Sequence, residues 1–169
     1  MRRALPLLLL AACGYTFDRD RGQRPLAQGG LPSVAVMPFD NATFRRGLEI
    51  RLTRLVADEV RARSPRAPRS PGDADYLLTG SVVHAREMVL SEDRADEIRE
   101  SSFVIRVQVV LENRTTGERI RSYSFEEREP FSTRAGRVAT LEQAQEEALR
   151  DLAESIVYWL ESTDPKVTS

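Results

Sequence analysis

The sequence predicts an α+β fold, a two-layer sandwich in which two helices pack on one face of a mixed four-stranded sheet. Three observations support this. Residues 44–63 and 141–160 repeat their apolar side chains with a helical period, and residues 103–111 alternate apolar and polar side chains as a half-buried strand does. The predicted order is strand, helix, three strands, helix, and a right-handed crossover would make the first two strands parallel.

The first strand and the first helix are predicted within residues 34–63. The apolar run Val34 to Phe39 indicates a strand, stopped by Pro38 and by the turn pair Asp40-Asn41. The apolar face of the helix comprises Leu48, Leu52, Leu55, Val56 and Val60. Its polar side carries Arg45, Arg46, Arg51, Arg54, Arg61 and Arg63 with Glu49, Asp58 and Glu59, which we interpret as a solvated face.

A second strand is predicted after the proline-rich loop 64–73, which no helix would tolerate. It covers Tyr76 to Val83, with an extension to Leu90 left open. Gly80 within it marks a bulge or a close backbone approach. Residues 91–100 are nearly all charged and form either a hairpin loop or a mobile excursion.

The clearest strand has apolar side chains at every odd position from Phe103 to Leu111. Turn residues 113–117 lead to an antiparallel partner strand, Arg119 to Glu127, and residues 130–136 are predicted to be irregular. The other face of the clearest strand is semi-polar and would be available to solvent or to a partner. It carries Val104, Arg106, Gln108 and Val110.

The second helix is predicted to begin at a capping box formed by Thr140 and Gln143 and to run roughly to Leu160. Asp164-Pro165 ends the ordered chain, which leaves residues 163–169 as a disordered tail. The predicted apolar face of the helix comprises Leu141, Ala144, Ala148, Leu152, Ile156 and Trp159, flanked by Val157 and Leu160.

The N-terminus has the layout of a secretory signal. Arg2 and Arg3 precede a short apolar run that ends in Leu10-Ala11-Ala12-Cys13, which looks like the lipobox of a bacterial lipoprotein. Residues 1–12 would then be removed, Cys13 would carry diacylglycerol and an N-acyl chain, and residues 13–33 would tether the domain 34–162. The alternative is an ordinary secretory signal with a chance cysteine. The run is well below the roughly 20 residues that span a bilayer, so lipid is the expected anchor.

Composition and motifs argue against several functions. The chain carries 25 basic and 26 acidic residues, and removal of the signal takes two arginines, so a nucleic-acid partner is not expected. Cys13 is the only cysteine and His84 the only histidine, so we expect no metal site and no catalytic triad. Glu126-Glu127 and Glu146-Glu147 are interpreted as solvated charges. We therefore expect a protein that is not an enzyme and has no cofactor apart from its lipid.

Several segments, taken in order, resemble the LptE family of outer-membrane lipopolysaccharide-assembly lipoproteins. The resemblance begins with Cys13-Gly14-Tyr15-Thr16-Phe17 and continues through residues 31–41 and 48–53. Residues 73–80 are similar to the family's "ADAVLEG" strand, and residues 111–118 resemble its "LxDxxTGE" hairpin. The order of these short motifs behind a lipobox is more specific than any one of them.

The resemblance implies a non-enzymatic lipoprotein on the inner leaflet of the outer membrane, facing the periplasm. Gly14, in place of Asp, agrees with the outer-membrane sorting signal. Family members plug the lumen of the β-barrel LptD, help it to assemble, and with it insert lipopolysaccharide into the outer leaflet. Because lipopolysaccharide is polyanionic, Arg106 on the semi-polar face and Arg114 at the hairpin tip are the candidate contacts with lipopolysaccharide or the partner.

Two other functions remain open at this point. Residues 34–41 are also similar to the opening strand of TolB-like and curli-secretion-type periplasmic domains, where "VAVLPF" begins an α/β fold in a secretion-channel subunit. The other alternative is a lipid-anchored periplasmic scaffold domain without a barrel partner.

Overall fold

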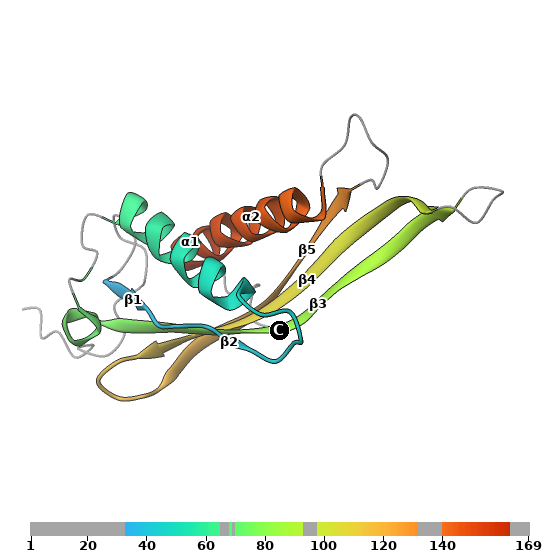
Figure 1. Ribbon diagram of the computed structural model, residues 1–169. Helices are drawn as coiled ribbons and strands as arrows, with labels where there is room; N and C mark the ends of the chain where they lie inside the picture. The colour runs from blue at the N-terminus through green and yellow to red at the C-terminus, as the bar shows by residue number, and fades with distance from the viewer. Residues whose placement is uncertain (1–32, 65–67, 69, 93–97, 132–139, 163–169) are drawn as a thin grey trace, which may run out of the picture.

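A computed structural model describes residues 33–64, 68, 70–92, 98–131 and 140–162. Its elements are β1 (Val34–Val36), β2 (Asp40–Asn41), α1 (Leu48–Arg63), the short 3₁₀ helix η1 (Pro71–Asp73), β3 (Tyr76–Glu92), β4 (Ile98–Asn113), β5 (Arg119–Phe131) and α2 (Leu141–Glu161). The two long helices lie side by side on one face of a mixed sheet (Figure 1), so the predicted α+β fold is confirmed.

The sheet has the order β1-β3-β4-β5, with β2 also paired to β3. β1 and β2 run parallel to β3, as the crossover rule predicts, and the pairs β3–β4 and β4–β5 are antiparallel. The predicted strand 34–39 is thus two short strands, which gives five strands instead of four. The cause lies at Pro38, which has no N–H to donate and interrupts the ladder just after the bond from Met37 N to Leu78 O (2.9 Å).

The core lies between the helices and one face of β4. The odd-numbered side chains from Phe103 to Leu111 are fully buried, as their alternation predicts. The buried residues of α1 are Leu48, Leu52, Val56 and Val60. Those of α2 are Ala144, Ala148, Leu149, Leu152, Ala153, Ile156, Val157, Trp159 and Leu160. Leu55 and Leu141 are only partly buried at the margin of this cluster.

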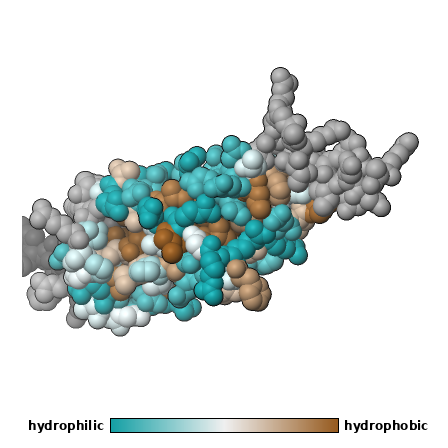
Figure 2. Space-filling view, in the orientation of Figure 1, coloured by the Kyte–Doolittle hydropathy of each residue, from teal (hydrophilic) through white to brown (hydrophobic). Residues whose placement is uncertain are grey.

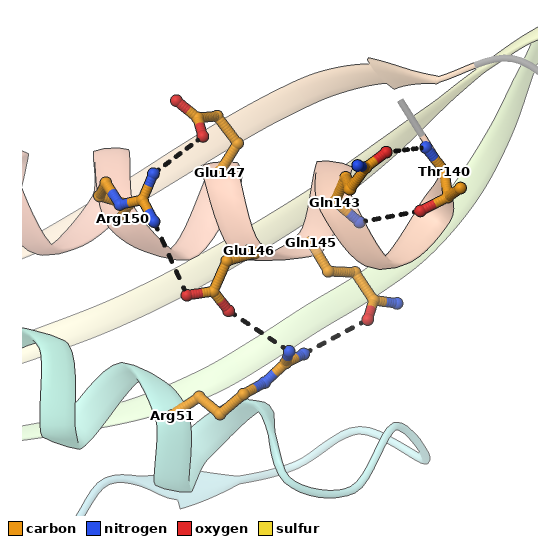
Figure 3. A network of polar contacts seen from close by, with 7 residues as sticks. All are labelled: Arg51, Thr140, Gln143, Gln145, Glu146, Glu147 and Arg150. Carbon is orange, nitrogen blue, oxygen red and sulfur yellow. Dashed lines mark hydrogen bonds and ion pairs between the residues drawn. The ribbon is translucent and has the colours of Figure 1, made fainter. Parts of the chain in front are cut away.

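A polar network on the surface joins the two helices (Figure 3). Arg51 of α1 lies 3.5 Å from Glu146 and donates to Gln145 Oε1 at 3.3 Å, and Arg150 lies 3.1 Å from Glu147. These side chains are about half exposed, and such surface pairs contribute at most about 1 kcal/mol each. The apolar layer, and not this network, therefore holds the helices on the sheet.

The capping box at the start of α2 is confirmed. Thr140 N donates to Gln143 Oε1 at 2.8 Å, and Gln143 N donates to Thr140 Oγ1 at 3.3 Å (Figure 3). Two amides that the helix itself leaves without acceptors are thereby satisfied.

Several predicted boundaries need correction. α1 begins at Leu48 and not near Phe44, because Gly47 adopts a φ of 88° just before it. β3 continues to Glu92 and β4 begins at Ile98, so of the two interpretations of the charged segment the hairpin is right; residues 93–97 lie outside the described part. β5 extends past Glu127 to Phe131, because Phe131 is buried and pairs with Ser101.

The pairing of β3 with β4 shifts by one residue between Val82 and His84. Residues opposite one another in a sheet point to the same side, so even-numbered side chains of β3 face the helices before the shift and odd-numbered ones face them after it. Glu87 therefore lies on the helix side, opposite Phe103, whereas His84 lies on the open side, opposite Arg106.

Gly80 allows a close approach within the core, as the sequence suggested. A Cβ atom at this position would lie 2.7 Å from Phe39 Cε2, inside any normal carbon–carbon contact. The ring of Phe39, which is 4% exposed, fills this space between the sheet and α1.

We expect Gly80→Ala to destabilise the domain by about 1–3 kcal/mol, because the added methyl group displaces a buried ring. Gly72→Ala is the matched control, since its Cβ would meet only Ser70 Oγ at 3.6 Å. Urea unfolding monitored by circular dichroism measures both. Equal midpoints for the two variants would contradict this account of Gly80.

Candidate functional site

No described element covers the face of the sheet opposite the helices, called the open face below, and polar side chains line its centre. Arg106 Nε donates to Glu126 Oε2 at 3.0 Å, which joins the centres of β4 and β5. This hydrogen bond is the main reason why the pKa of Glu126 lies below its usual range. The other exposed polar side chains on this face are Arg86, Gln108, Ser124 and Arg128. Val104, predicted here as semi-polar surface, is 3% exposed between Arg86 and Arg128.

Arg114 lies at the turn after β4, and its hydrogen bonds hold that turn in place. Its Nε donates to Ala74 O at 2.7 Å, and its backbone N donates to Asp75 O at 3.0 Å. These bonds tie the hairpin to the segment that enters β3. Arg106 and Asn113 are roughly 23 Å apart at the usual strand rise. The structure therefore does not bring Arg106 and Arg114 together into one site.

The remaining sequence candidates can be placed briefly. Cys13 lies outside the described residues. His84 is half-buried on the open face, and in the described ranges no group of three or more His, Cys, Asp and Glu residues could hold a metal ion. No helix among those same residues is both long and apolar enough to cross a bilayer.

A groove of about 710 Å³ runs between β5 and α2. β5 is the last strand of the sheet order, so one of its edges carries no neighbouring strand among the described elements. Tyr158 stands 69% exposed in this groove, whereas Trp159 is buried, and its Nε1 has no hydrogen-bond partner in the described structure. The groove is lined by Arg63, Tyr123, Ser124, Phe125, Glu126, Glu127, Glu154, Ser155, Tyr158, Trp159 and Ser162.

Arg121 contacts Trp159 and the C-terminal end of α2, and the sequence analysis missed it. Its guanidinium lies 4.4 Å from the centre of the Trp159 ring and donates to Leu160 O (2.9 Å) and Ser162 O (2.7 Å). A cation at this place offsets the negative end of the α2 dipole. Burial lowers the pKa of Arg121. The sequence did contain a signal for Arg121. It lies two residues before Tyr123 and four before Phe125 in the same strand, so its side chain is expected on the same, inward-facing side as theirs.

Carboxylates face one another across the β5–α2 seam. Glu127 and Glu129 lie on the helix side of β5, where burial, followed by the charge of Asp151, raises the pKa of both groups. Glu147 adds to this effect on Glu129. Glu127 is thus not the fully solvated charge that the sequence suggested, whereas its neighbour Glu126 is exposed and paired with Arg106.

We expect Glu127→Gln to stabilise the domain at pH 7. A folded-state pKa above the unfolded value of about 4.3 means that the protonated group favours folding, and that this contribution is lost as pH rises through the folded pKa. The gain, up to about 1 kcal/mol, should vanish near pH 4. Urea midpoints at both pH values test this. Glu126→Gln is the control, which removes the acceptor of Arg106 and should not stabilise; a Glu127→Gln variant less stable than this control at pH 7 would contradict the assignment.

The exterior of the helices is mostly hydrophilic, with hydrophobic residues in separate patches between the layers (Figure 2).

The sequence matches a family model described as "LptE: Lipopolysaccharide-assembly" over residues 31–159. The chain belongs to the LptE family. LptE proteins are non-enzymatic lipopolysaccharide-assembly lipoproteins, so the resemblance seen in the short motifs is confirmed at family level.

Solved structures share the fold of this LptE family member. Protein XCC0632 from Xanthomonas campestris matches with a TM-score of 0.58 and 16% identity over 78% of this chain and 84% of its own. Hypothetical protein CT253 from Chlamydia trachomatis matches with a TM-score of 0.52 and 12% identity over 77% and 95%. PelC from Paraburkholderia phytofirmans, a dodecamer, matches with a TM-score of 0.51 and 16% identity over 78% and 90%. No curated protein matches the sequence significantly.

Proposed function

We propose that this LptE family member is the lipid-anchored partner of an LptD-like outer-membrane β-barrel. In this proposal residues 1–12 are a signal peptide, Cys13 carries diacylglycerol and an N-acyl chain, and residues 13–33 tether the domain to the inner leaflet. The domain plugs the barrel, helps it to assemble, and supports insertion of lipopolysaccharide into the outer leaflet. The family match over residues 31–159, behind a complete lipobox, carries the proposal.

The open face of the sheet fits such a role. Large barrels enclose a polar, water-filled lumen, and a plug needs a rigid body whose exposed surface is compatible with water. The charged and polar side chains around Arg106 supply that surface, and the helix layer supports it from behind. We therefore assign the open face with Arg106, and separately Arg114 at the hairpin turn, to contacts with the barrel or with lipopolysaccharide. An anion at Arg106 would have to compete with Glu126, whereas in the guanidinium of Arg114 the Nε alone has a hydrogen-bond partner among the described residues.

Anchoring is tested by Cys13→Ala. Without the thiol no thioether to diacylglycerol can form, so we expect no incorporation of labelled fatty acid and a protein that is either uncleaved or no longer held by acyl chains. Metabolic labelling and membrane fractionation measure this. Labelled fatty acid still attached to the variant would refute the lipobox assignment.

The partner is tested by purification of the tagged, lipidated protein from detergent-solubilised outer membranes. We expect an LptD-like barrel in equal amount. A homo-oligomeric ring would instead favour the secretion-subunit alternative, and a protein without partners would favour the scaffold alternative. In the same preparation, photo-crosslinking amino acids at positions 106 and 114 report the contacts. If neither position crosslinks to barrel or lipopolysaccharide, the arginine assignments are wrong, even where the barrel is recovered.

A further inference from the structure

The groove between β5 and α2, which lie side by side (Figure 1), gives access to the edge of a strand. Its lining includes five consecutive residues of β5, Tyr123 to Glu127. Successive side chains of a strand point to opposite faces of the sheet, so consecutive residues can line one groove only where it runs along the strand's edge. No described strand neighbours this outer edge of β5. The groove therefore exposes main-chain groups as well as side chains.

The main-chain groups at the outer edge belong to the even-numbered residues of β5. Asn113 N donates to Glu118 O at 2.8 Å across the hairpin, so the odd-numbered residues of β4 and their odd-numbered partners in β5 bond to each other. Pro130, which is even-numbered, has no N–H and is tolerated in a strand where its nitrogen faces an edge. Both observations place the N–H and C=O groups of Ser124 and Glu126 at the outer edge, inside the groove.

This edge is regular. The pairing of β4 with β5 runs from Leu111 opposite Arg121 to Ser101 opposite Phe131 without a shift. A regular unpaired edge is a template for a further strand, and proteins commonly interrupt such an edge with a bulge, a lysine or a proline. None of these occurs between Arg121 and Arg128. That stretch of β5 is therefore able to accept an added strand.

Carboxylates without a cation lie at one end of the groove. Glu127 and Glu129 are on the helix side of β5, where burial and then the charge of Asp151 raise the pKa of both groups, with no arginine acting in the opposite direction. Glu154 is exposed in the lining of the same groove. Within the described ranges, none of these four carboxylates has a basic side chain at ion-pair distance.

The two arginines near the groove are engaged elsewhere. Arg63 Nε donates to Glu59 Oε1 at 2.6 Å, and its Nη1 lies 3.5 Å from Glu161 Oε2. The guanidinium of Arg121 is held by the last carbonyls of α2. The end of the groove at Glu127 thus keeps its negative charge, and a ligand that brings cations relieves it.

The other end of the groove is aromatic. The ring centres of Tyr123 and Phe125 lie 4.6 Å apart, and those of Phe125 and Trp159 lie 6.2 Å apart. Trp159 lines the groove and is only 2% exposed, yet its Nε1 has no acceptor among the described residues. A buried donor without an acceptor is costly, and a polypeptide offers both carbonyl acceptors and apolar side chains.

We propose that the groove between β5 and α2 binds an extended, basic polypeptide segment of another protein, which adds an antiparallel strand to the outer edge of β5. The main chain of the segment bonds to Ser124 and Glu126. Its alternate side chains on the helix side are cationic beside Glu127 and Glu129 and apolar beside the aromatic end. The strand edge favours a polypeptide over a small organic cation, and the carboxylates exclude an acidic segment. This site is separate from the open face, so it does not depend on the proposed function.

The test titrates the full lipidated chain, in non-ionic detergent, with the fluorescent, end-blocked peptide Lys-Thr-Lys-Thr-Leu-Thr-Val. In antiparallel pairing its lysines lie opposite Glu129 and Glu127, and its leucine and valine lie opposite Phe125 and Tyr123. We expect saturable binding by fluorescence anisotropy. The same peptide with glutamate in place of lysine should bind at least about tenfold more weakly, which corresponds to about 1.4 kcal/mol.

Main-chain bonding is tested with N-methylated forms of the peptide. Its second and third threonines lie opposite Glu126 and Ser124, so methylation of their nitrogens removes donors to β5 and should weaken binding by about tenfold. Methylation at the second lysine and at the leucine is the matched control, because these nitrogens point away from β5. Equal loss for both forms would show that the peptide does not bind as a strand.

The charge contribution is tested with Glu127→Gln. This variant is expected to fold more stably than the native chain at pH 7, so weaker binding cannot result from unfolding. We expect its dissociation constant to rise about fivefold. Glu118→Gln, at an exposed carboxylate beyond the hairpin turn, is the matched control and should bind as the native chain does. Equal affinities of Glu127→Gln and the native chain would overturn the charge assignment and with it the basic occupant.

Hydrogen exchange measured by mass spectrometry locates the peptide. Saturation should slow exchange over residues 122–128, where main-chain groups face the outer edge. Absence of saturable binding, or slowed exchange only elsewhere, overturns the proposal. Slow exchange of this segment in the peptide-free monomer would mean that the chain's own residues cover the edge. A peptide-free dimer by sedimentation, with the same segment slowed, would assign the edge to a second copy, and either result overturns the proposed occupant.

Discussion

The row of buried side chains on one face of β4 is the constraint on which the rest of this structure depends. β4 pairs on both edges, with β3 and with β5, so it is the central strand of the antiparallel part of the sheet. Its odd-numbered residues from Phe103 to Leu111 are fully buried and can be covered only by the two helices. Once both helices occupy that face, no described element covers the opposite face, whose exposed side chains are mostly polar. The site assigned to a partner is therefore a consequence of how the core is closed.

The shift of pairing between Val82 and His84 has an effect well beyond the sheet. Without it, Glu87 would point to the open face, and Arg45 would lose its ion pair with this carboxylate. The loop between β2 and α1, which carries Arg45, is thus fixed partly by a local irregularity in a strand that it does not belong to. Such irregularities redirect side chains without changing the topology, and they give this fold a way to place a surface loop firmly.

Periodicity and local chemistry made much of the fold predictable. The alternation in β4, the apolar stripes of the helices and the capping box at Thr140 involve residues close in sequence, so the pattern contains the information. The split of the first strand at Pro38 and the late start of α1 after Gly47 follow from local backbone chemistry that the apolar pattern does not record. The length of β5 depends on Ser101 of β4, a partner far along the chain. The candidate site was also only partly predictable. Alternation places Arg106 on the open face, but its hydrogen bond to Glu126 depends on the β4–β5 register. The role of Arg121 depends on the packing of Trp159 against it.

The inward-facing carboxylates of β5 bear on how copies of this chain behave toward one another. A second molecule that extended the sheet by antiparallel pairing at this edge, in the register that places Glu127 opposite Glu129, would bring these carboxylates close to those of the first molecule, beside Asp151 and Glu147 of α2. That concentration of negative charge opposes self-association through the outer edge of β5, which carries no neighbouring strand in the described fold. The seam that weakens the folded monomer slightly thus discourages the chain from polymerising with itself.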